Sequence, residues 1–294
     1  MTATALPAPA AVAQVLKPIT WFPPMWAFGC GAVSAGVAIE GRWGVIAAGI
    51  VLAGPLVCAT SQVVNDWYDR HVDAINEPGR PIPSGRIPGR WGLWLALLWT
   101  GLSLVVAALL GPVVFPAAVL GLALAWAYSA PPFRLKRNGW WGNLAVGLSY
   151  ESLPWFTGAA VLAGTMPSAE IVTVALLYGL GAHGIMTLND FKAIEGDTRM
   201  GVGSLPVRLG VDAAARLACL VMAAAQVAVV ACLVSWDRPL HALVVAVLLA
   251  AQGGLMSRFL ARPRERAVWF SGLGVLLYVL GMLAAAFGLA GLDA

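Results

Sequence analysis

The sequence predicts an all-α, polytopic membrane protein with about nine transmembrane helices. Of the 294 residues, 60% are hydrophobic and 11% are charged, whereas roughly 25% of an ordinary soluble domain is charged. Apolar stretches close to the roughly 20 residues that a helix needs to cross a bilayer also recur along almost the whole chain. Few polar segments separate them, so we expect a single intramembrane domain over residues 21–294.

Residues 1–20 precede the first apolar stretch and are rich in Ala and Pro, so we expect a flexible cytoplasmic N-terminal tail there rather than a signal peptide. Nine candidate spans follow, at Trp21–Ile39, Trp43–Val64, Trp91–Leu110, Val113–Tyr128, Trp140–Ala163, Ile171–Leu188, Ala213–Ser235, Pro239–Phe259 and Val268–Leu289. The turn at Gly111-Pro112 shortens the fourth span, which leaves a count of eight as the alternative.

The distribution of basic residues supports nine spans with a cytoplasmic N-terminus. In that topology 16 of the 18 Lys and Arg residues lie inside, and only Arg42 and Arg238 lie outside. This asymmetry is what the positive-inside rule expects, and removing one span would destroy it. We therefore expect a multi-pass protein of the cell's inner membrane, cytoplasmic or intracytoplasmic. Its net charge of +4 then reflects membrane topology, and we expect no nucleic acid partner.

Acidic residues gather at the cytoplasmic ends of the second and sixth spans. The first cluster contains Asn65, Asp66, Asp69 and Asp73. If the helix continues, spacings of three and four place the three carboxylates along one stripe, where they repel one another. A divalent cation relieves that repulsion, and oxygen-only ligands favour Mg²⁺. The alternative is an ordinary solvated helix end.

The second cluster repeats the Asn-Asp-aromatic opening 124 residues later, at Asn189 and Asp190, and continues through Glu195 and Asp197. This spacing indicates two four-helix pseudo-repeats plus one final helix. Equivalent sites of such repeats converge on a central cavity between the halves. Two acidic ends that face each other there can hold a diphosphate through two metal ions.

Three strings carry a family resemblance: NDWYDRHVDAINEPGRPIPSGRI, YSAPPFRLKRNGWWGN and NDFKAIEGDTRMGVGSLPVRLG. They resemble the intramembrane UbiA-type prenyltransferases, and within that superfamily the bacteriochlorophyll and chlorophyll synthases. The resemblance implies a nine-helix fold, Mg²⁺ as cofactor, and transfer of a geranylgeranyl or phytyl group from its diphosphate to the propionate of (bacterio)chlorophyllide. One departure concerns the second motif, where many members carry Asp-x-x-x-Asp but Gly201 follows Asp197 here.

By matched position, the resemblance implies a first Mg²⁺ site at Asn65, Asp66, Asp69 and Asp73 and a second at Asp190, Glu195 and Asp197. Asp66, Asp69, Asp190 and Asp197 are the residues expected to be essential for catalysis. Candidate diphosphate contacts are Arg70, Arg134, Lys136 and Lys192. The alternative for these cations is ordinary charge in cytoplasmic loops.

Glu151 falls near the middle of the fifth span, where an ionised carboxylate costs roughly 2.5 kcal/mol or more. We expect it to face the cavity and contact the tetrapyrrole acceptor. The alternative is a structural hydrogen bond to a neighbouring helix.

Two other functions fit parts of the pattern. One is aromatic prenylation of a quinone or haem precursor. The other is membrane transport, because internal repeats and intramembrane charge also mark transporters. Acidic groups gathered at one face argue against transport, since coupling-ion sites of transporters lie near the bilayer midplane. Besides the two substrates and the lipid bilayer, other pigment-synthesis proteins are candidate partners.

Overall fold

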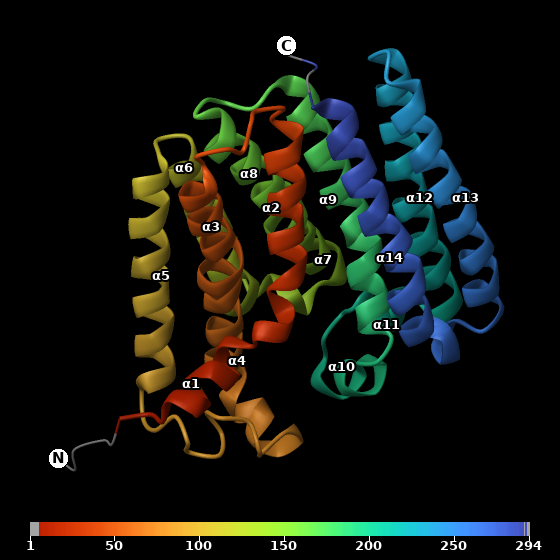
Figure 1. Cartoon of the computed structure of the whole chain (residues 1–294). Coiled ribbons are helices and arrows are strands. Elements are labelled where there is room, and N and C mark those ends of the chain that lie inside the picture. Colours follow the sequence, from red (N-terminus) through yellow and green to blue (C-terminus); the bar gives the residue numbers. More distant parts are fainter. Residues whose placement is uncertain (1–5, 291, 293–294) are drawn as a thin grey trace.

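The computed structural model describes residues 6–290 and 292, and the regular structure of this part is helical apart from one isolated bridge between Asn138 and Gly203 (Figure 1). The helices are α1 (Pro9–Leu16), α2 (Phe22–Ser34), α3 (Trp43–Val51), α4 (Ala59–Asn76), α5 (Trp91–Leu110), α6 (Val114–Ser129), α7 (Gly139–Gly147), α8 (Leu153–Ala163), α9 (Ala169–Asp190), α10 (Ile194–Met200), α11 (Leu205–Leu209), α12 (Val211–Ser235), α13 (Pro239–Ala261) and α14 (Pro263–Leu289). Short 3-10 or π segments accompany them: η1 (Pro18–Thr20), η2 (Leu52–Cys58), η3 (Leu135–Arg137) and η4 (Leu148–Ser152).

The predicted all-helical membrane fold is confirmed. In the described part of the chain, six helical segments are long and apolar enough to cross a bilayer: Trp43–Asn76, α5, α9, α12, α13 and α14. The apolar helix α6 is shorter, and α2 and the α7–η4–α8 segment occupy the other predicted spans. A helix therefore lies on every predicted stretch, while the total of nine membrane crossings stays a prediction.

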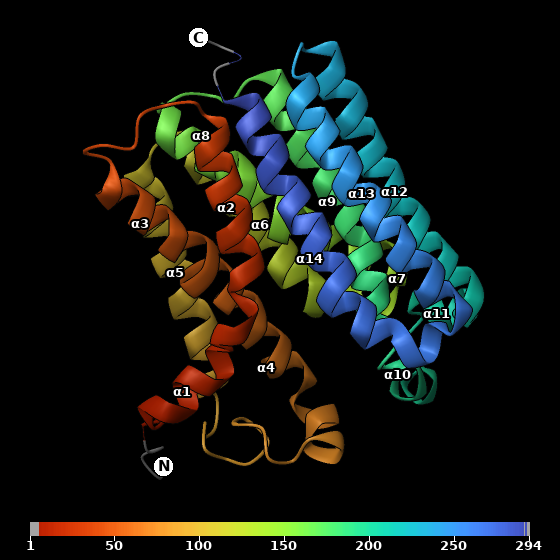
Figure 2. The same cartoon turned by 45° about the vertical axis from the view of Figure 1, so that its right-hand side comes forward.

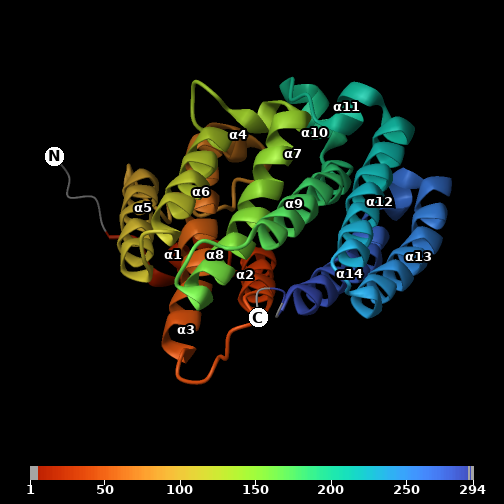
Figure 3. The same cartoon turned by 90° about the horizontal axis from the view of Figure 1, so that it is seen from above.

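The helices form an array that is most open to lipid at its two ends. Seen from above, α5 and α13 lie at opposite ends of the array (Figure 3). Only 22% of the apolar window of each is buried inside the protein. Their exposed side chains are mostly large and apolar, such as Leu109 and Leu243. Such surfaces are stable in lipid, which is as apolar as the side chains themselves.

Small residues allow the inner helices to touch backbone to backbone. A Cβ atom at Gly31 of α2 would lie 1.9 Å from the carbonyl oxygen of Trp155 in α8, and one at Gly158 would lie 2.0 Å from that of Phe28. No side chain fits in either place. Close approach through small residues is the usual way for helices to pack in a membrane, where the hydrophobic effect gives no drive.

Two π segments interrupt the helices that line the interior. Segment η2 joins α3 to α4 and contains Pro55, and segment η4 joins α7 to α8. Pro lacks the amide hydrogen that a regular helix needs, which accounts for the wider turn at Pro55. Such π turns are rare and frequently occur at functional sites.

The acidic motifs lie at one end of the molecule. The ends of α4 and α9, the short helices α10 and α11, and α1 all occupy the lower end in Figures 1 and 2. Residues 1–5 of the expected flexible tail lie outside the described residues. Residues 9–16, also expected to be loose, instead form α1, because Ala11, Val15 and Leu16 bury an apolar face in the same cluster as Val63 and Ile82.

Candidate active site

A cavity of about 620 Å³ lies between the helices beside the two acidic motifs. Asn65 of α4 and Asn189 of α9, the first residues of the two motifs, both line it. Tyr150 and Glu151 of η4 line it as well, and most of the remaining wall is apolar. The cavity therefore joins a polar mouth, next to the first residues of the two acidic motifs, to an apolar interior.

The cavity reaches the lipid-facing surface between α2 and α14. Phe22 of α2 and Leu276 of α14 both line it, yet their residues are 57% and 51% exposed. Ser271 and Gly272 of α14 complete this edge without bulky side chains. A long apolar ligand can therefore extend from the cavity into the bilayer without leaving an apolar environment.

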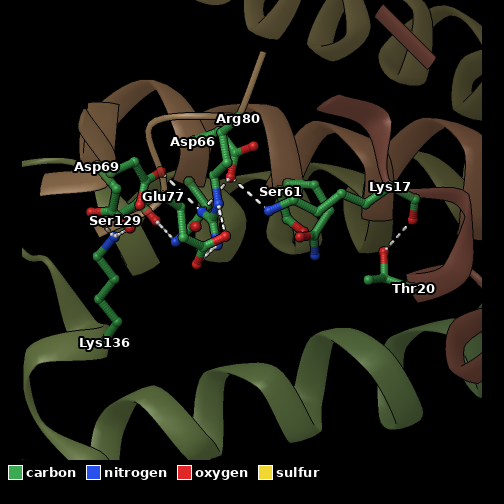
Figure 4. A network of polar contacts seen from close by, with 12 residues as sticks. Lys17, Thr20, Ser61, Asp66, Asp69, Glu77, Arg80, Ser129 and Lys136 are labelled. Carbon is green, nitrogen blue, oxygen red and sulfur yellow. Dashed lines mark hydrogen bonds and ion pairs between the residues drawn. The ribbon is translucent and has the colours of Figure 1, made fainter. Parts of the chain in front are cut away.

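The carboxylates of α4 are balanced by cations from three other segments, and two of these cations face Asp66 and Asp73 (Figure 4). Lys17, between α1 and η1, places its Nζ 2.6 Å from Oδ1 of Asp66. The guanidinium of Arg80 donates to Oδ2 of Asp73 at 2.9 Å and lies 3.4 Å from Oδ1 of Asp66. Asp66 is buried, and its other oxygen, Oδ2, has no hydrogen-bond partner among the described residues.

Arg80 also closes the loop that follows α4. Its Nη2 atom donates to Glu77 at 2.7 Å and its Nε atom donates to the same carboxylate at 2.8 Å. These hydrogen bonds lower the pKa of Glu77 from its ordinary value. One guanidinium thus joins Asp66, Asp73 and Glu77 and fixes the loop against the acidic stripe.

Asp69 is paired with Lys136 from the loop after α6. The Nζ atom of Lys136 lies 2.6 Å from both carboxylate oxygens of Asp69 (Figure 4). Burial lowers the pKa of the Lys136 ammonium, and attraction to Asp69 opposes that shift. Asn65 is held nearby, donating from Nδ2 to Oγ of Ser129 at 3.1 Å.

The second acidic cluster is held differently. Asp190, the last residue of α9, accepts a hydrogen bond from Nδ2 of Asn143 in α7 at 3.2 Å. Asp197 lies in the short helix α10, and burial raises the pKa of its carboxyl. Glu195 of α10 is exposed, and its Oε1 atom lies 3.9 Å from the guanidinium of Arg264 in α14. Glu195 therefore lies close to the start of α14.

The loop that carries Lys136 connects the two clusters. The amide of Gly139 donates to the carbonyl of Gly203 at 2.8 Å, and the amide of Gly203 donates to the carbonyl of Arg137 at 2.9 Å. Gly203 follows α10, so this bridge ties the second acidic segment to the loop whose lysine holds Asp69. Tyr128, at the end of α6, interacts electrostatically with Asp69, Asp190 and Asp197. The two clusters thus border one site.

Comparison with known proteins identifies this architecture. A model of the UbiA prenyltransferase family matches residues 20–273. The chain belongs to the UbiA prenyltransferase family. It is 59% identical over 288 residues to the bacteriochlorophyll synthase 33 kDa chain of Cereibacter sphaeroides, a match that covers 98% of this chain and 95% of that protein. It is 40% identical over 288 residues to the chloroplastic chlorophyll synthase of Oryza sativa subsp. japonica, covering 93% and 75%.

Solved structures share the fold. A UbiA homolog from Archaeoglobus fulgidus bound to GPP and Mg²⁺ superposes with a TM-score of 0.72 at 18% identity, covering 93% of this chain and 99% of that one. At this identity the likeness concerns the fold alone. It agrees with the helical arrangement expected from the sequence.

In this UbiA-family chain, no group of three or more His, Cys, Asp or Glu side chains in the described part is placed to hold a metal ion. The α4 carboxylates face Lys17, Arg80 and Lys136 instead. The donors present nevertheless suit Mg²⁺, because all are oxygen atoms and one of them, Oδ2 of Asp66, is buried without a partner. Mg²⁺ would bind here by replacing cationic side chains as counter-charge.

The predicted diphosphate contacts lie in different settings. Lys136 reaches the first cluster, and Arg134 lies in the same loop with left-handed backbone (φ 44°) and a buried Nε atom that has no partner among the described residues. Arg70 instead stacks on Trp67, with its guanidinium carbon 4.0 Å from the ring centre, and donates to the Trp67 carbonyl. Lys192 is exposed.

Lys17, Tyr128 and Asn143 also border the site, although the sequence did not single them out as site residues, and Arg80 borders it as well. Arg80 follows the first motif closely, and a Pro-rich loop that returns to the motif was the available signal. Lys17 and Asn143 carried no such signal, because helix packing brings them to the acidic residues from distant parts of the chain.

Proposed function

We propose that this protein is a magnesium-dependent prenyltransferase that esterifies the propionate of bacteriochlorophyllide with geranylgeranyl or phytyl diphosphate, as the last step of bacteriochlorophyll synthesis. The observation that carries the proposal is the pair of acidic clusters, joined through the Lys136 loop, at the mouth of an apolar cavity. Full-length identity of 59% to a bacteriochlorophyll synthase supports the acceptor. Bacteriochlorin is favoured over chlorin because identity to the chlorophyll synthase is lower, at 40%.

The donor diphosphate belongs at the acidic mouth. Asn65, Asp66, Asp69 and Asp73 would hold one Mg²⁺, and Asp190 and Asp197 a second. When bound, Mg²⁺ supplies positive charge that neutralises the leaving diphosphate. Glu195 is left out of this set, because its exposed side chain pairs with Arg264.

The basic side chains of the mouth contribute to the same charge balance. Lys136 and Arg134 share one loop beside both clusters and are the main candidates for contacts to diphosphate oxygens. Arg80 and Lys17 already lie against Asp66, so they can turn toward an anion when a metal ion takes over that carboxylate. Arg70 and Lys192 stay candidates that must rotate to reach the donor.

The apolar cavity explains how the transfer proceeds without hydrolysis. The allylic carbon–oxygen bond of the donor breaks, its electron pair leaves with the diphosphate, and a delocalised carbocation forms. A propionate oxygen then forms the new ester bond. The carboxylate is already anionic at pH 7, because its unperturbed pKa is about 4 to 5, so no protein base is required. Apolar walls exclude the water that would otherwise capture the cation.

The membrane setting follows from the same features. The apolar helices place the protein in a membrane, and we assign it to the inner membrane of the cell with the N-terminus and both acidic clusters on the cytoplasmic side. Mg²⁺ from the cytoplasm and the polar diphosphate head group of the donor can then meet at the acidic mouth. The prenyl tail extends into lipid between α2 and α14.

Purified protein incubated with Mg²⁺, geranylgeranyl or phytyl diphosphate and a panel of acceptors tests the proposal. We expect release of pyrophosphate and a product with the mass of the bacteriochlorophyllide ester, while the propionate methyl ester of the pigment is inert. Ready prenylation of 4-hydroxybenzoate with the pigment acid untouched would establish the aromatic alternative. Absence of Mg²⁺-dependent pyrophosphate release with every acceptor would favour transport.

A further inference from the structure

Glu151 lies on the wall of the cavity, and its Oε2 atom has no hydrogen-bond partner in the part of the chain that the structure describes. It lies in the π segment η4, and its residue is only 5% exposed. Among the described residues, no group hydrogen-bonds to its Oε2 atom, and no cation forms an ion pair with it. Cys30 and Tyr278 interact with it electrostatically, and neither of these two groups is a cation.

The neighbouring residue, Tyr150, is a polar group of the same cavity wall that does have hydrogen-bond partners. The hydroxyl of Tyr150 accepts a hydrogen bond from Nε2 of Gln62 at 2.9 Å and lies 3.3 Å from Sγ of Cys58 and 3.4 Å from Oγ of Ser61. Its bonding capacity is used by η2 and α4. Glu151 has no such arrangement, although it follows Tyr150 directly and lines the same space.

An unpaired carboxyl at this depth is costly for the protein unless a ligand binds to it. Leaving a buried polar group unsatisfied costs about 1–3 kcal/mol, and an ionised carboxylate within a membrane costs about 2.5 kcal/mol or more. With no cation beside it, the favoured form of Glu151 is the protonated one, which can donate one hydrogen bond. A ligand that presents an acceptor atom to Glu151 removes this cost, so the site favours such a ligand.

The position of Glu151 fits the ring system of the pigment better than the diphosphate. The side chains that hold its neighbour Tyr150 lie one to two helical turns from Asn65 along α4, about 5–10 Å further into the membrane. An anion at this depth would meet a carboxyl and apolar walls rather than cations. A flat, largely apolar ring that carries a carbonyl group matches both the walls and the free donor.

We propose that protonated Glu151 donates a hydrogen bond to a ring carbonyl of the macrocyclic acceptor and thereby orients the acceptor so that its propionate reaches the acidic mouth. Glu151 is thus a positioning and specificity residue. This inference rests on the proposed function, because it assumes that a tetrapyrrole occupies the cavity.

The test compares Glu151→Leu with Glu151→Gln, which keeps an N–H donor. Thr157→Val is the matched control, because Thr157 is equally buried but bonds within its own helix, to the carbonyl of Leu153. We expect Glu151→Leu to raise the KM for bacteriochlorophyllide about tenfold, the value of one good hydrogen bond, and to leave the KM for the prenyl diphosphate unchanged. Glu151→Gln should show a smaller rise, and Thr157→Val none.

A readout independent of turnover is the carbonyl stretching band of bound pigment, measured by resonance Raman spectroscopy. In the wild-type protein we expect one ring carbonyl band at lower frequency than in solvent without hydrogen-bond donors. Glu151→Leu should return that band to the free position, and Glu151→Gln should shift it only in part.

Unchanged acceptor KM and an unchanged carbonyl band in a well-folded Glu151→Leu protein would overturn the inference while leaving the proposed function intact. A changed KM with an unchanged carbonyl band, together with a loss of binding when zinc replaces the pigment magnesium, would also overturn it and indicate a metal ligand instead. Failure of the wild-type protein to esterify any pigment would reject the proposed function itself. If Glu151→Leu does not fold, as judged by thermal melting, the carbonyl band of pigment bound to Glu151→Gln is used instead. A band at the wild-type frequency in Glu151→Gln would then overturn the inference.

Discussion

The two acidic clusters begin with the same Asn-Asp-aromatic motif but differ in how their charge is balanced. The carboxylates of α4 face Lys17, Arg80 and Lys136 at 2.6–3.4 Å. Among the described residues, neither Asp190 nor Asp197 forms an ion pair, and Asp190 relies on an amide from Asn143. A repeated motif therefore does not imply equal electrostatics, and metal binding has a different starting point in each half of the site.

The largest expected effect on turnover comes from changes in the α4 cluster, whose carboxylates are paired with cations. Asp66→Asn or Asp69→Asn should lower turnover by about 10²- to 10³-fold, because each removes a charge that the bound metal needs. The fold should persist, since each change removes repulsion between carboxylates and this offsets part of the loss of the ion pairs with Lys17 or Lys136. Pyrophosphate release and thermal melting measure the two effects. Near-normal turnover in both variants would refute the metal assignment.

A smaller effect is expected from the second cluster. Asp190→Asn should lower turnover about tenfold to a hundredfold at low Mg²⁺ and should recover part of that loss at high Mg²⁺, because only one of several ligands is weakened. Asp212→Asn is the matched control, an exposed acid in the first turn of α12. If raising Mg²⁺ restores nothing, Asp190 acts in some way other than metal binding.

Lys136 and Lys192 allow a sharper comparison between cations of the two clusters. Lys136→Met should lower turnover about tenfold, because this half-buried ammonium faces Asp69 beside the donor site. Lys192→Met should have a smaller effect, since Lys192 is exposed. For each variant, the KM for the prenyl diphosphate and kcat are measured separately, which distinguishes weaker donor binding from slower transfer. The reverse order would show that the second cluster supplies the main diphosphate contact.

Arg80 tests whether a cationic side chain takes the place of a metal ion when Mg²⁺ is withheld. Arg80→Met should lower the melting temperature in EDTA by about 2–4 °C, because Asp66 and Asp73 lose their shared counter-charge. Saturating Mg²⁺ should reduce the difference in melting temperature between Arg80→Met and the wild-type protein. Arg86→Met, in the same loop but bonded to Gln14 and the Gly79 carbonyl, provides the control. If Arg80→Met lowers the melting temperature equally with and without Mg²⁺, Arg80 does not take the place of a metal ion.

The smallest expected effect is that of pH. At saturating Mg²⁺, rates should stay flat between about pH 6.5 and 8, because a propionate with an ordinary pKa is ionised throughout this range. Burial raises the pKa of Asp197 in the metal-free protein, so protons compete with metal there as pH falls. A rate that drops toward pH 6.5 even at saturating Mg²⁺ would indicate that the second cluster limits turnover.

Sequence reasoning succeeded where the physical signal was local. Apolar length predicted the helices, and carboxylate spacing predicted the acidic end of α4, where Asp66, Asp69 and Asp73 share one site with their cations. It carries no information where tertiary packing decides. Whether Glu195 turns inward or toward Arg264 depends on where α14 begins, and no spacing within the motif contains that information.

The N-terminal segment is a second region whose structure depends on tertiary packing and could not be predicted from local sequence. Residues 9–16 have the composition of a loose tail, yet they pack on a surface formed by α4 and the loop at Ile82 and Ile87. Lys17 reaches Asp66 as a result. A short segment of this kind gains helical structure from its partner surface rather than from its own propensity.

The opening between α2 and α14 has a consequence for how the protein is assayed. Because Phe22 and Leu276 line the cavity and also face lipid, a prenyl tail or an esterified pigment can enter and leave sideways, within the plane of the bilayer. The relevant substrate density is then an amount per area of membrane, not per volume of solution. Added detergent or lipid dilutes substrate across a larger interface, so apparent KM values should scale with the amount of amphiphile at constant bulk concentration.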